Sequence, residues 1–301
     1  MNARLLATAL ACAGLAACTH AETQAPAPIT TAAMPELSCV QFEWASAAGV
    51  SERAAILLPA TVNGRATTLQ LDTGADINVL RGPADVWSVA ADENGWGAAS
   101  VHIGELDLGE ARVRTGGEAG ELGGTLGLPA LLGQVVVLDY PAQQFCLSGT
   151  MPAALGERAH FVGARIENMK FWFPVQVNGT TYENFFFDTG ASLFPLSTDL
   201  ELWRQLTGDD PEAADHVVEV NSWGNTIQLR GSAATGEAHI GDVSLGRPLI
   251  YHVSAAPTFF ADWGFSFPVH GLAGNASFFD SVLVLDLRPD SYRLGIIPAG
   301  Q

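Results

Sequence analysis

Residues 185–196 read FFFDTGASLFPL, so an aspartate, Asp188, stands directly behind three phenylalanines. A carboxylate in such a setting must be partly buried, and an unpaired charge is costly to bury. Chains keep such a group when the site needs it, or when a second carboxylate or hydrogen bonds offset the cost. The first question about this sequence is therefore whether it supplies a partner for Asp188.

A second copy of the motif lies upstream. LLPATVNGRATTLQLDTGADINVL (57–80) matches WFPVQVNGTTYENFFFDTGASLFPL (172–196) at one proline, at an Asn-Gly pair and at Asp-Thr-Gly-Ala. An Asn-Gly pair between apolar stretches predicts a tight hairpin turn. Each copy therefore predicts a strand, a turn, a second strand and then a polar loop that carries the aspartate, Asp72 or Asp188.

The repeat continues downstream. VHIGELDLG (101–109) parallels AHIGDVSLG (238–246), and TLGLPALLGQVVVLDYPAQQFCL (125–147) parallels LAGNASFFDSVLVLDLRPDSYRL (272–294). Because the same elements occur twice in the same order, we expect a mostly-β chain built from a duplicated unit. The expected divisions are an N-terminal lobe at 50–148, a connector at 149–167 and a C-terminal lobe at 168–301.

The chain resembles aspartic peptidases of the pepsin/retropepsin fold, in a bacterial form. The resemblance rests on two apolar-Asp-Thr-Gly-Ala motifs, each followed by two small or apolar residues and a glycine, Gly127 in the first half and Gly274 in the second. A single Asp-Thr-Gly is a weak signal, whereas two copies with matching flanks are specific. The resemblance implies a bilobal fold made of two retropepsin-like lobes in one polypeptide.

The resemblance also assigns roles to individual residues. Asp72 and Asp188 would be the catalytic pair, which shares one proton because two close carboxylates cannot both ionise. The remaining assignments are Thr73 and Thr189 as clamps to the opposite loop, Gly74, Gly190, Ala75 and Ala191 as loop residues, and Gly127 and Gly274 as supports. Ordinary turn chemistry is the alternative for the small residues. Alanine at 75 and 191 lacks the hydroxyl common in pepsins, so we expect raised pKa values for the pair.

A flap, the hairpin that covers the site in the family, is less clearly marked. Trp96, in Asn-Gly-Trp-Gly, and Trp223, in Ser-Trp-Gly, occupy comparable intervals of the two halves. The Tyr-Gly pair usual in pepsins is absent from the expected place. Core packing or a surface turn is the alternative for each tryptophan.

The N-terminus predicts a lipoprotein signal peptide at 1–17. An apolar run too short to span a membrane ends in Leu-Ala-Ala and then Cys18, the expected lipidation site; an ordinary signal peptide is the alternative. Residues 18–49 are expected to be the lipidated Cys and a tether, or in part a pro-segment. By resemblance to such lipoproteins, Thr19 after the cysteine favours the outer membrane, facing the periplasm.

Two other cysteines remain, Cys39 and Cys146. In an oxidising compartment an even pair favours a disulfide, with two buried thiols as the alternative. No histidine cluster has metal-ligand spacing, and no phosphate-binding loop is present, so we expect neither a metal nor another cofactor.

The charge of the chain limits which classes of partner it can bind. The formal net charge is −18, which argues against nucleic acid as a partner. The favoured function is an aspartic endopeptidase that acts on peptide or protein substrates as a monomer, attached to the membrane through its lipid. The alternative is a catalytically inactive relative that binds peptides or envelope components.

Overall fold

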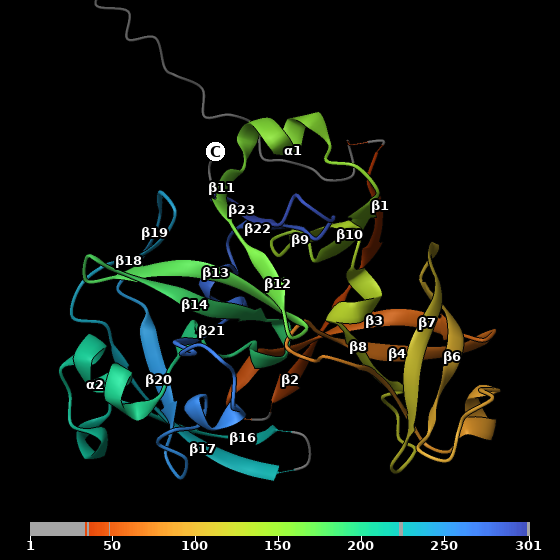
Figure 1. Ribbon diagram of the computed structural model, residues 1–301, viewed down its shortest axis with the longest axis horizontal. Coiled ribbons are helices and arrows are strands. Elements are labelled where there is room, and N and C mark those ends of the chain that lie inside the picture. Colours follow the sequence, from red (N-terminus) through yellow and green to blue (C-terminus); the bar gives the residue numbers. More distant parts are fainter. Residues whose placement is uncertain (1–33, 35, 48, 223–224, 300–301) are drawn as a thin grey trace, which may run out of the picture.

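The computed structural model describes residues 34, 36–47, 49–222 and 225–299. The predicted signal peptide, Cys18 and Trp223 lie outside these residues. Strands dominate the described chain, so the prediction of a mostly-β fold is confirmed. Figure 1 shows three groups of strands: β3 to β8 on the right, β13 to β21 on the left, with β2 and β12 near the centre, and a sheet above and between the two groups.

The seven-stranded sheet has the order β2-β3-β4-β8-β5-β7-β6. Its strands are β2 (Glu43–Ala47), β3 (Ser51–Val62), β4 (Arg65–Asp72), β5 (Asn78–Arg81), β6 (Trp96–Ile103), β7 (Leu106–Gly116) and β8 (Gly124–Gly127). Most pairs are antiparallel, but β4 pairs with β8 and β5 pairs with β7 in parallel. Parallel pairing at β4 brings the end of that strand next to a segment more than fifty residues later.

The ten-stranded sheet has the order β16-β17-β20-β15-β21-β14-β13-β18-β19, with β12 paired to β13. Its strands are β12 (Arg165–Glu167), β13 (Lys170–Val177), β14 (Thr180–Asp188), β15 (Leu196–Ser197), β16 (His216–Ser222), β17 (Asn225–Ala233), β18 (Ala238–Ile240), β19 (Val243–Gly246), β20 (Leu249–Val253) and β21 (Gly271–Gly274). Again two pairs are parallel, β14 with β21 and β15 with β20.

A six-stranded antiparallel sheet connects the two halves in the order β1-β10-β9-β22-β23-β11. Its strands are β1 (Ser38–Gln41), β9 (Val135–Asp139), β10 (Gln144–Ser148), β11 (His160–Gly163), β22 (Val282–Asp286) and β23 (Arg293–Ile297). The central pair joins β9 of the first half to β22 of the second. Both strands are apolar and wholly buried, because this sheet is covered on both faces.

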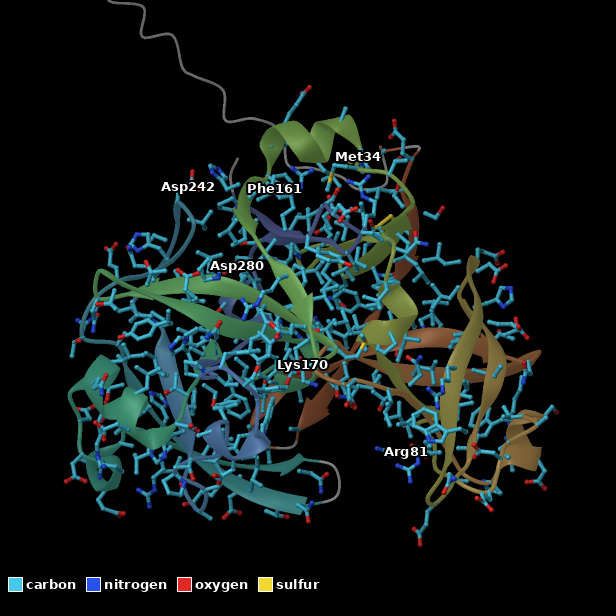
Figure 2. All side chains as sticks on the ribbon, viewed as in Figure 1. Met34, Arg81, Phe161, Lys170, Asp242 and Asp280 are labelled. Carbon is cyan, nitrogen blue, oxygen red and sulfur yellow. A yellow bond between two sulfur atoms is a disulfide. The ribbon has the colours of Figure 1, made fainter. Side chains whose placement is uncertain are left out.

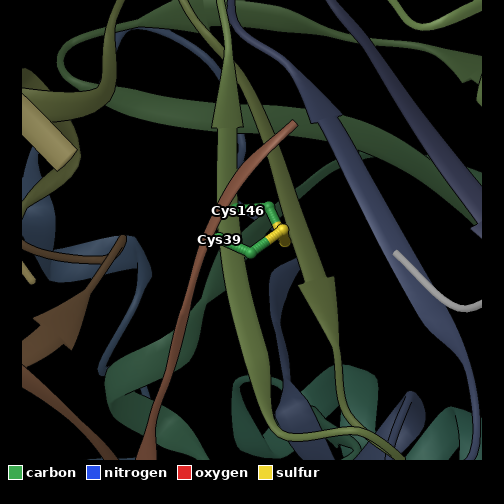
Figure 3. The surroundings of a disulfide bond; sticks show 2 residues. All are labelled: Cys39 and Cys146. Atoms are coloured by element: carbon green, nitrogen blue, oxygen red, sulfur yellow. A yellow bond between two sulfur atoms is a disulfide. The ribbon is translucent and has the colours of Figure 1, made fainter. Parts of the chain in front are cut away.

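The sheet also carries the predicted disulfide. Cys39 of β1 and Cys146 of β10 are register partners and form a bond between their sulfur atoms (Figure 3). The prediction of a disulfide is thus confirmed. The bond attaches the first strand to the end of the first half.

Local turn chemistry follows the sequence closely. The β3–β4 and β13–β14 hairpins turn at Asn63-Gly64 and Asn178-Gly179, and all four residues have φ between 47° and 80°. Two consecutive left-handed residues define the tight turn that matches strand twist, and Asn-Gly adopts it at least cost. Both predicted hairpins are therefore confirmed.

Helices are few and short. They are α1 (Ala153–Arg158), α2 (Leu200–Thr207) and the 3-10 turns η2 (Ala84–Trp87), η3 (Leu128–Leu131), η4 (Thr189–Ala191), η5 (Pro211–Ala213), η6 (Ala261–Trp263) and η7 (Asn275–Ser277). Among the described residues, no helix combines the length and apolarity that crossing a bilayer requires.

One predicted boundary needs correction. Residues 38–47 fall in the range assigned to the tether, yet they form β1 and β2. The physical reason is burial: Phe42, between the two strands, is 1% exposed, and Trp44 packs against the core. The predicted connector is likewise structured, since 149–167 contains α1, β11 and β12.

Candidate active site

The two Asp-Thr-Gly loops begin at the ends of equivalent strands. Asp72 is the last residue of β4 and lies in register with Gly127 of the parallel strand β8. Asp188 is the last residue of β14 and lies in register with Gly274 of the parallel strand β21. Each aspartate is thus fixed by two strands from distant parts of the chain.

The two supporting glycines allow the close approach that this arrangement needs. A Cβ atom at Gly127 would overlap the carbonyl oxygen of Ile77, and one at Gly274 would overlap those of Ala191 and Phe194. Backbone atoms cannot move aside without displacing the loop itself, so only glycine fits at these positions. The support role assigned from the resemblance has this steric basis.

The loops are fixed to each other by a reciprocal set of hydrogen bonds. The Thr73 N–H donates to Thr189 Oγ1 at 2.9 Å, and the Thr189 N–H donates to Thr73 Oγ1 at 3.0 Å. Each hydroxyl then donates onward to the opposite strand: Thr73 to the Phe187 carbonyl at 3.1 Å, and Thr189 to the Leu71 carbonyl at 3.0 Å. Both threonines are fully buried, so these four bonds have no competition from water.

This clamp brings the two carboxyl groups together. The Asp72 and Asp188 carboxyl groups lie close enough that each shifts the pKa of the other. Each loop glycine lies against the opposite carboxylate: a Cβ at Gly74 would fall 2.5 Å from Asp188 Oδ1, and one at Gly190 would fall 2.7 Å from Asp72 Oδ1. The four residues therefore form one packed unit in which no side chain fits at either glycine.

The electrostatics of the pair are asymmetric. Burial, followed by the charge of Asp188 and the hydrogen bond to it, holds the pKa of Asp72 well above its usual range. Burial also raises the pKa of Asp188, but the hydrogen bonds from Asp72 and from the Gly190 N–H, the latter at 2.8 Å, act in the opposite direction. Because the pKa of each aspartate is raised and the two groups interact, the pair as a unit favours holding one shared proton.

Burial is the largest cause of the raised pKa values, and the backbone hydrogen bonds from Ala75 and Ala191 act in the opposite direction. The effect of the missing hydroxyls at 75 and 191 stays a prediction. Ala75 is buried, with its N–H donating to the Asp72 carbonyl oxygen at 3.1 Å. The hydroxyl of Ser192 lies one residue beyond Ala191, yet it donates to the Thr189 carbonyl instead.

Three polar residues that the motif search did not single out complete the loops. Asn78 accepts a hydrogen bond from the Gly127 N–H at 2.9 Å. Asn275, next to Gly274, donates to the Thr189 carbonyl at 3.0 Å and accepts from the Tyr140 hydroxyl at 2.8 Å. Their position within a few residues of the motifs was the available signal for the two asparagines. Tyr140 carried no local signal, since it is recruited from the other half.

A fourth residue missed from the sequence, Lys170, donates from its ammonium nitrogen to the Gly74 carbonyl oxygen at 2.5 Å. It begins β13, the strand beside β14, so it reaches from the second half to the first Asp-Thr-Gly loop.

The structure describes one of the two flap candidates, Trp96, but not the other, Trp223. Trp96 begins β6, after a tight turn closed by the Asp92 carboxylate, and the Arg112 guanidinium lies over its ring at 4.3 Å. That setting is a packed surface turn. Trp223 lies outside the described residues, but the hairpin of β16 and β17 that flanks it packs on the same apolar cluster as Ala191. A flap role remains a prediction for both tryptophans.

An aromatic cluster borders the second loop. Trp172, Phe186 and Phe260 are buried in it, Ala191 packs against it, and Trp263 at its edge is 37% exposed. Apolar surface thus reaches from the loop to the outside of the protein.

Within the described residues, no group of three or more histidine, cysteine or acidic side chains is placed to hold a metal ion. Comparison with models of known protein families finds no match, and no curated protein matches the sequence significantly.

Proposed function

We propose that the protein is an aspartic endopeptidase whose catalytic pair is Asp72 and Asp188. The observation that carries the proposal is the convergence of two carboxyl groups from separate loops, buried Asp72 and partly buried Asp188, each packed against the glycine of the opposite loop and each with a raised pKa. The reciprocal Thr73–Thr189 bonds support it, because they fix the carboxyl groups relative to each other. Groups with perturbed pKa values at a preorganised site are typical of general acid–base catalysis.

The proposed mechanism uses the two carboxyl groups in complementary roles. Asp188, ionised and oriented by the Gly190 N–H, removes a proton from a water molecule as that water attacks the scissile carbonyl carbon. Asp72, which carries the remaining proton, donates it to the carbonyl oxygen, giving a neutral tetrahedral intermediate. As the C–N bond of the intermediate breaks, Asp188 gives the proton that it took from water to the leaving amine nitrogen, and a hydroxyl of the intermediate returns a proton to Asp72, which restores the singly protonated pair.

We include in this proposal the finer assignment of fold, two retropepsin-like lobes in a pepsin-like arrangement. Its support is the repeated pairing of an Asp-bearing strand with a later parallel strand ending in glycine, β4 with β8 and β14 with β21. The sheet that contains β9 and β22 would then be the junction of the lobes.

The cellular location is part of the proposal and rests on sequence. Leu-Ala-Ala before Cys18 supports a lipid-anchored protein of the cell envelope, in the outer membrane facing the periplasm. The Cys39–Cys146 disulfide fits an oxidising compartment.

The test is a digest of a peptide library, analysed by mass spectrometry, with and without a statine-type inhibitor. We expect inhibitor-sensitive cleavage by the wild type and none by Asp72→Asn or Asp188→Asn. Asp76→Asn is the matched control, since Asp76 is an exposed carboxylate four residues after Asp72. Substantial turnover by either pair variant would rule out the mechanism.

The same digest tests the alternative function, a catalytically inactive protein that binds peptides or envelope components. If wild-type protein retains library peptides without cleaving them from pH 3 to pH 8, the peptide-binding alternative replaces the peptidase. Support for hydrolysis comes from the presence of two carboxyl groups close enough to shift each other's pKa, which peptide binding alone does not require.

A further inference from the structure

Lys170 is the one lysine among the 301 residues of the sequence, and it is buried. Lysine is rarely buried without a partner, because its ammonium group is strongly hydrated in water. In Figure 2 Lys170 lies near the centre of the view, between the two outer sheets. The burial of the one lysine in the sequence calls for a specific reason.

The contacts of Lys170 point to the aspartate pair. Its ammonium nitrogen donates to the Gly74 carbonyl oxygen at 2.5 Å and lies 5.8 Å from the centre of the Trp263 ring. Gly74 is the residue that packs against the Asp188 carboxylate. The ammonium group thus fixes the backbone of one catalytic loop at the point where that loop touches the opposite aspartate.

The nearby acidic side chains have other partners. Glu167 is the cross-strand neighbour of Lys170, but its carboxylate pairs with Arg165 at 3.3 Å. Asp262, beside Trp263, accepts a hydrogen bond from Thr258. Within the described chain, no carboxylate forms an ion pair with Lys170, and the negative charge that acts with it is that of Asp72 and Asp188.

The buried lysine occurs in only one of the two repeats. Pro174 aligns with Pro59 in the repeat, so Lys170, four residues earlier, aligns with Ala55. The first half therefore offers no equivalent cation. A single positive charge beside the pair matches the single negative charge that a proton-sharing pair carries.

We propose that Lys170 is a positioning residue of the aspartate pair: it holds the Gly74 loop and adds a buried positive charge that favours ionisation of one of the two carboxyl groups. Burial favours the uncharged, doubly protonated pair, which cannot accept a proton from water; the loop hydrogen bonds oppose this effect, and the charge of Lys170 adds to them. The charge of Lys170 lowers the pKa of both aspartates, opposing the effect of burial. The inference rests on the proposed peptidase function for its kinetic consequence, but not for its electrostatic one.

The kinetic test compares the pH profile of kcat/KM for wild type, Lys170→Met and Lys170→Arg. Because loss of the cation raises both apparent pKa values of the pair, both limbs of the Lys170→Met profile should move to higher pH. On the acidic limb this means a loss of about two- to tenfold at fixed pH. Lys170→Arg should restore the limbs. The control is Arg165→Met, which removes a cation from the same aromatic cluster and should leave both limbs in place.

A second measurement needs neither a substrate nor a lysine variant. Lysine labelled with ¹³C at Cε gives a single side-chain resonance in this protein, because Lys170 is its one lysine. We expect its chemical shift to change as the aspartate pair ionises, and the change to disappear in the Asp72→Asn, Asp188→Asn double variant. A shift independent of pH, or one that persists in the double variant, would overturn the inference.

The two measurements separate the two proposals. A pair-dependent titration of the Lys170 resonance in a protein that cleaves no peptide would support the electrostatic role and reject the peptidase. A Lys170→Met profile that falls in height with both limbs unmoved would reject the charge role while leaving the peptidase intact.

Discussion

Removing the threonine clamp should destabilise the protein strongly for so small a change. Thr73→Val keeps the shape of the side chain but deletes the hydroxyl. The Phe187 carbonyl then loses its donor and the Thr189 N–H loses its acceptor, both among buried residues. A buried polar group left unpaired costs about 1–3 kcal/mol. We therefore expect a loss of about 2–6 kcal/mol in the free energy of unfolding.

Thermal unfolding followed by circular dichroism and calorimetry provides the assay. At about 2 °C per kcal/mol for a chain of this size, the midpoint should fall by about 4–12 °C. Thr181→Val is the matched control, because Thr181 is exposed on β14 and should change stability by no more than about 0.5 kcal/mol. A Thr73→Val midpoint equal to that of the control would refute the reasoning.

The reciprocal geometry adds a sharper requirement. Thr189→Val deletes the other two bonds of the same set, those to the Leu71 carbonyl and from the Thr73 N–H. Since the first substitution already loosens the loops, the double variant should lose less stability than the sum of the single losses, by about 0.5–3 kcal/mol. Strict additivity would mean that the two threonines act independently.

Three further outcomes follow. The double variant Cys39→Ser, Cys146→Ser removes a disulfide that joins residues 107 positions apart, and it should lower the free energy of unfolding by about 4–5 kcal/mol. Unfolding in guanidinium measures this loss, and an unchanged midpoint would contradict the prediction. Gly127→Ala should abolish peptide cleavage because its Cβ overlaps the Ile77 carbonyl, whereas Gly163→Ala, in open space, should not; equal activity of the two would count against the steric argument. The pKa of Asp72 is higher in the folded state than in the unfolded state, so the wild type loses stability as the pH rises above the unfolded value of about 3.9. Asp72→Asn should therefore melt at a higher temperature than the wild type at pH 7. At pH 3 the two proteins should melt at nearly the same temperature. Melting curves that differ equally at both pH values would exclude that linkage.

The sequence by itself determined the features that depend on short-range physics. Asn-Gly marks the two hairpin turns because two consecutive left-handed residues need those side chains. Apolar runs such as Val135–Asp139 and Val282–Asp286 specified buried strands. The two Asp-Thr-Gly-Ala copies singled out the residues of the candidate site, and their duplication made the pattern specific.

Only the tertiary structure decided which distant groups meet. The hydrogen bonds between Thr73 and Thr189 join residues 116 positions apart, and no local pattern encodes a contact at that separation. The tether was predicted from the Ala-, Thr- and Pro-rich stretch 19–35 and extended to residue 49, yet pairing with β10 and β3 makes residues 38–47 strands. Lys170 carried no motif at all. Its significance arises from burial beside two carboxyl groups that converge from separate strands, because the electrostatic effect of a charge depends on its distance and surroundings in space rather than on its position along the chain.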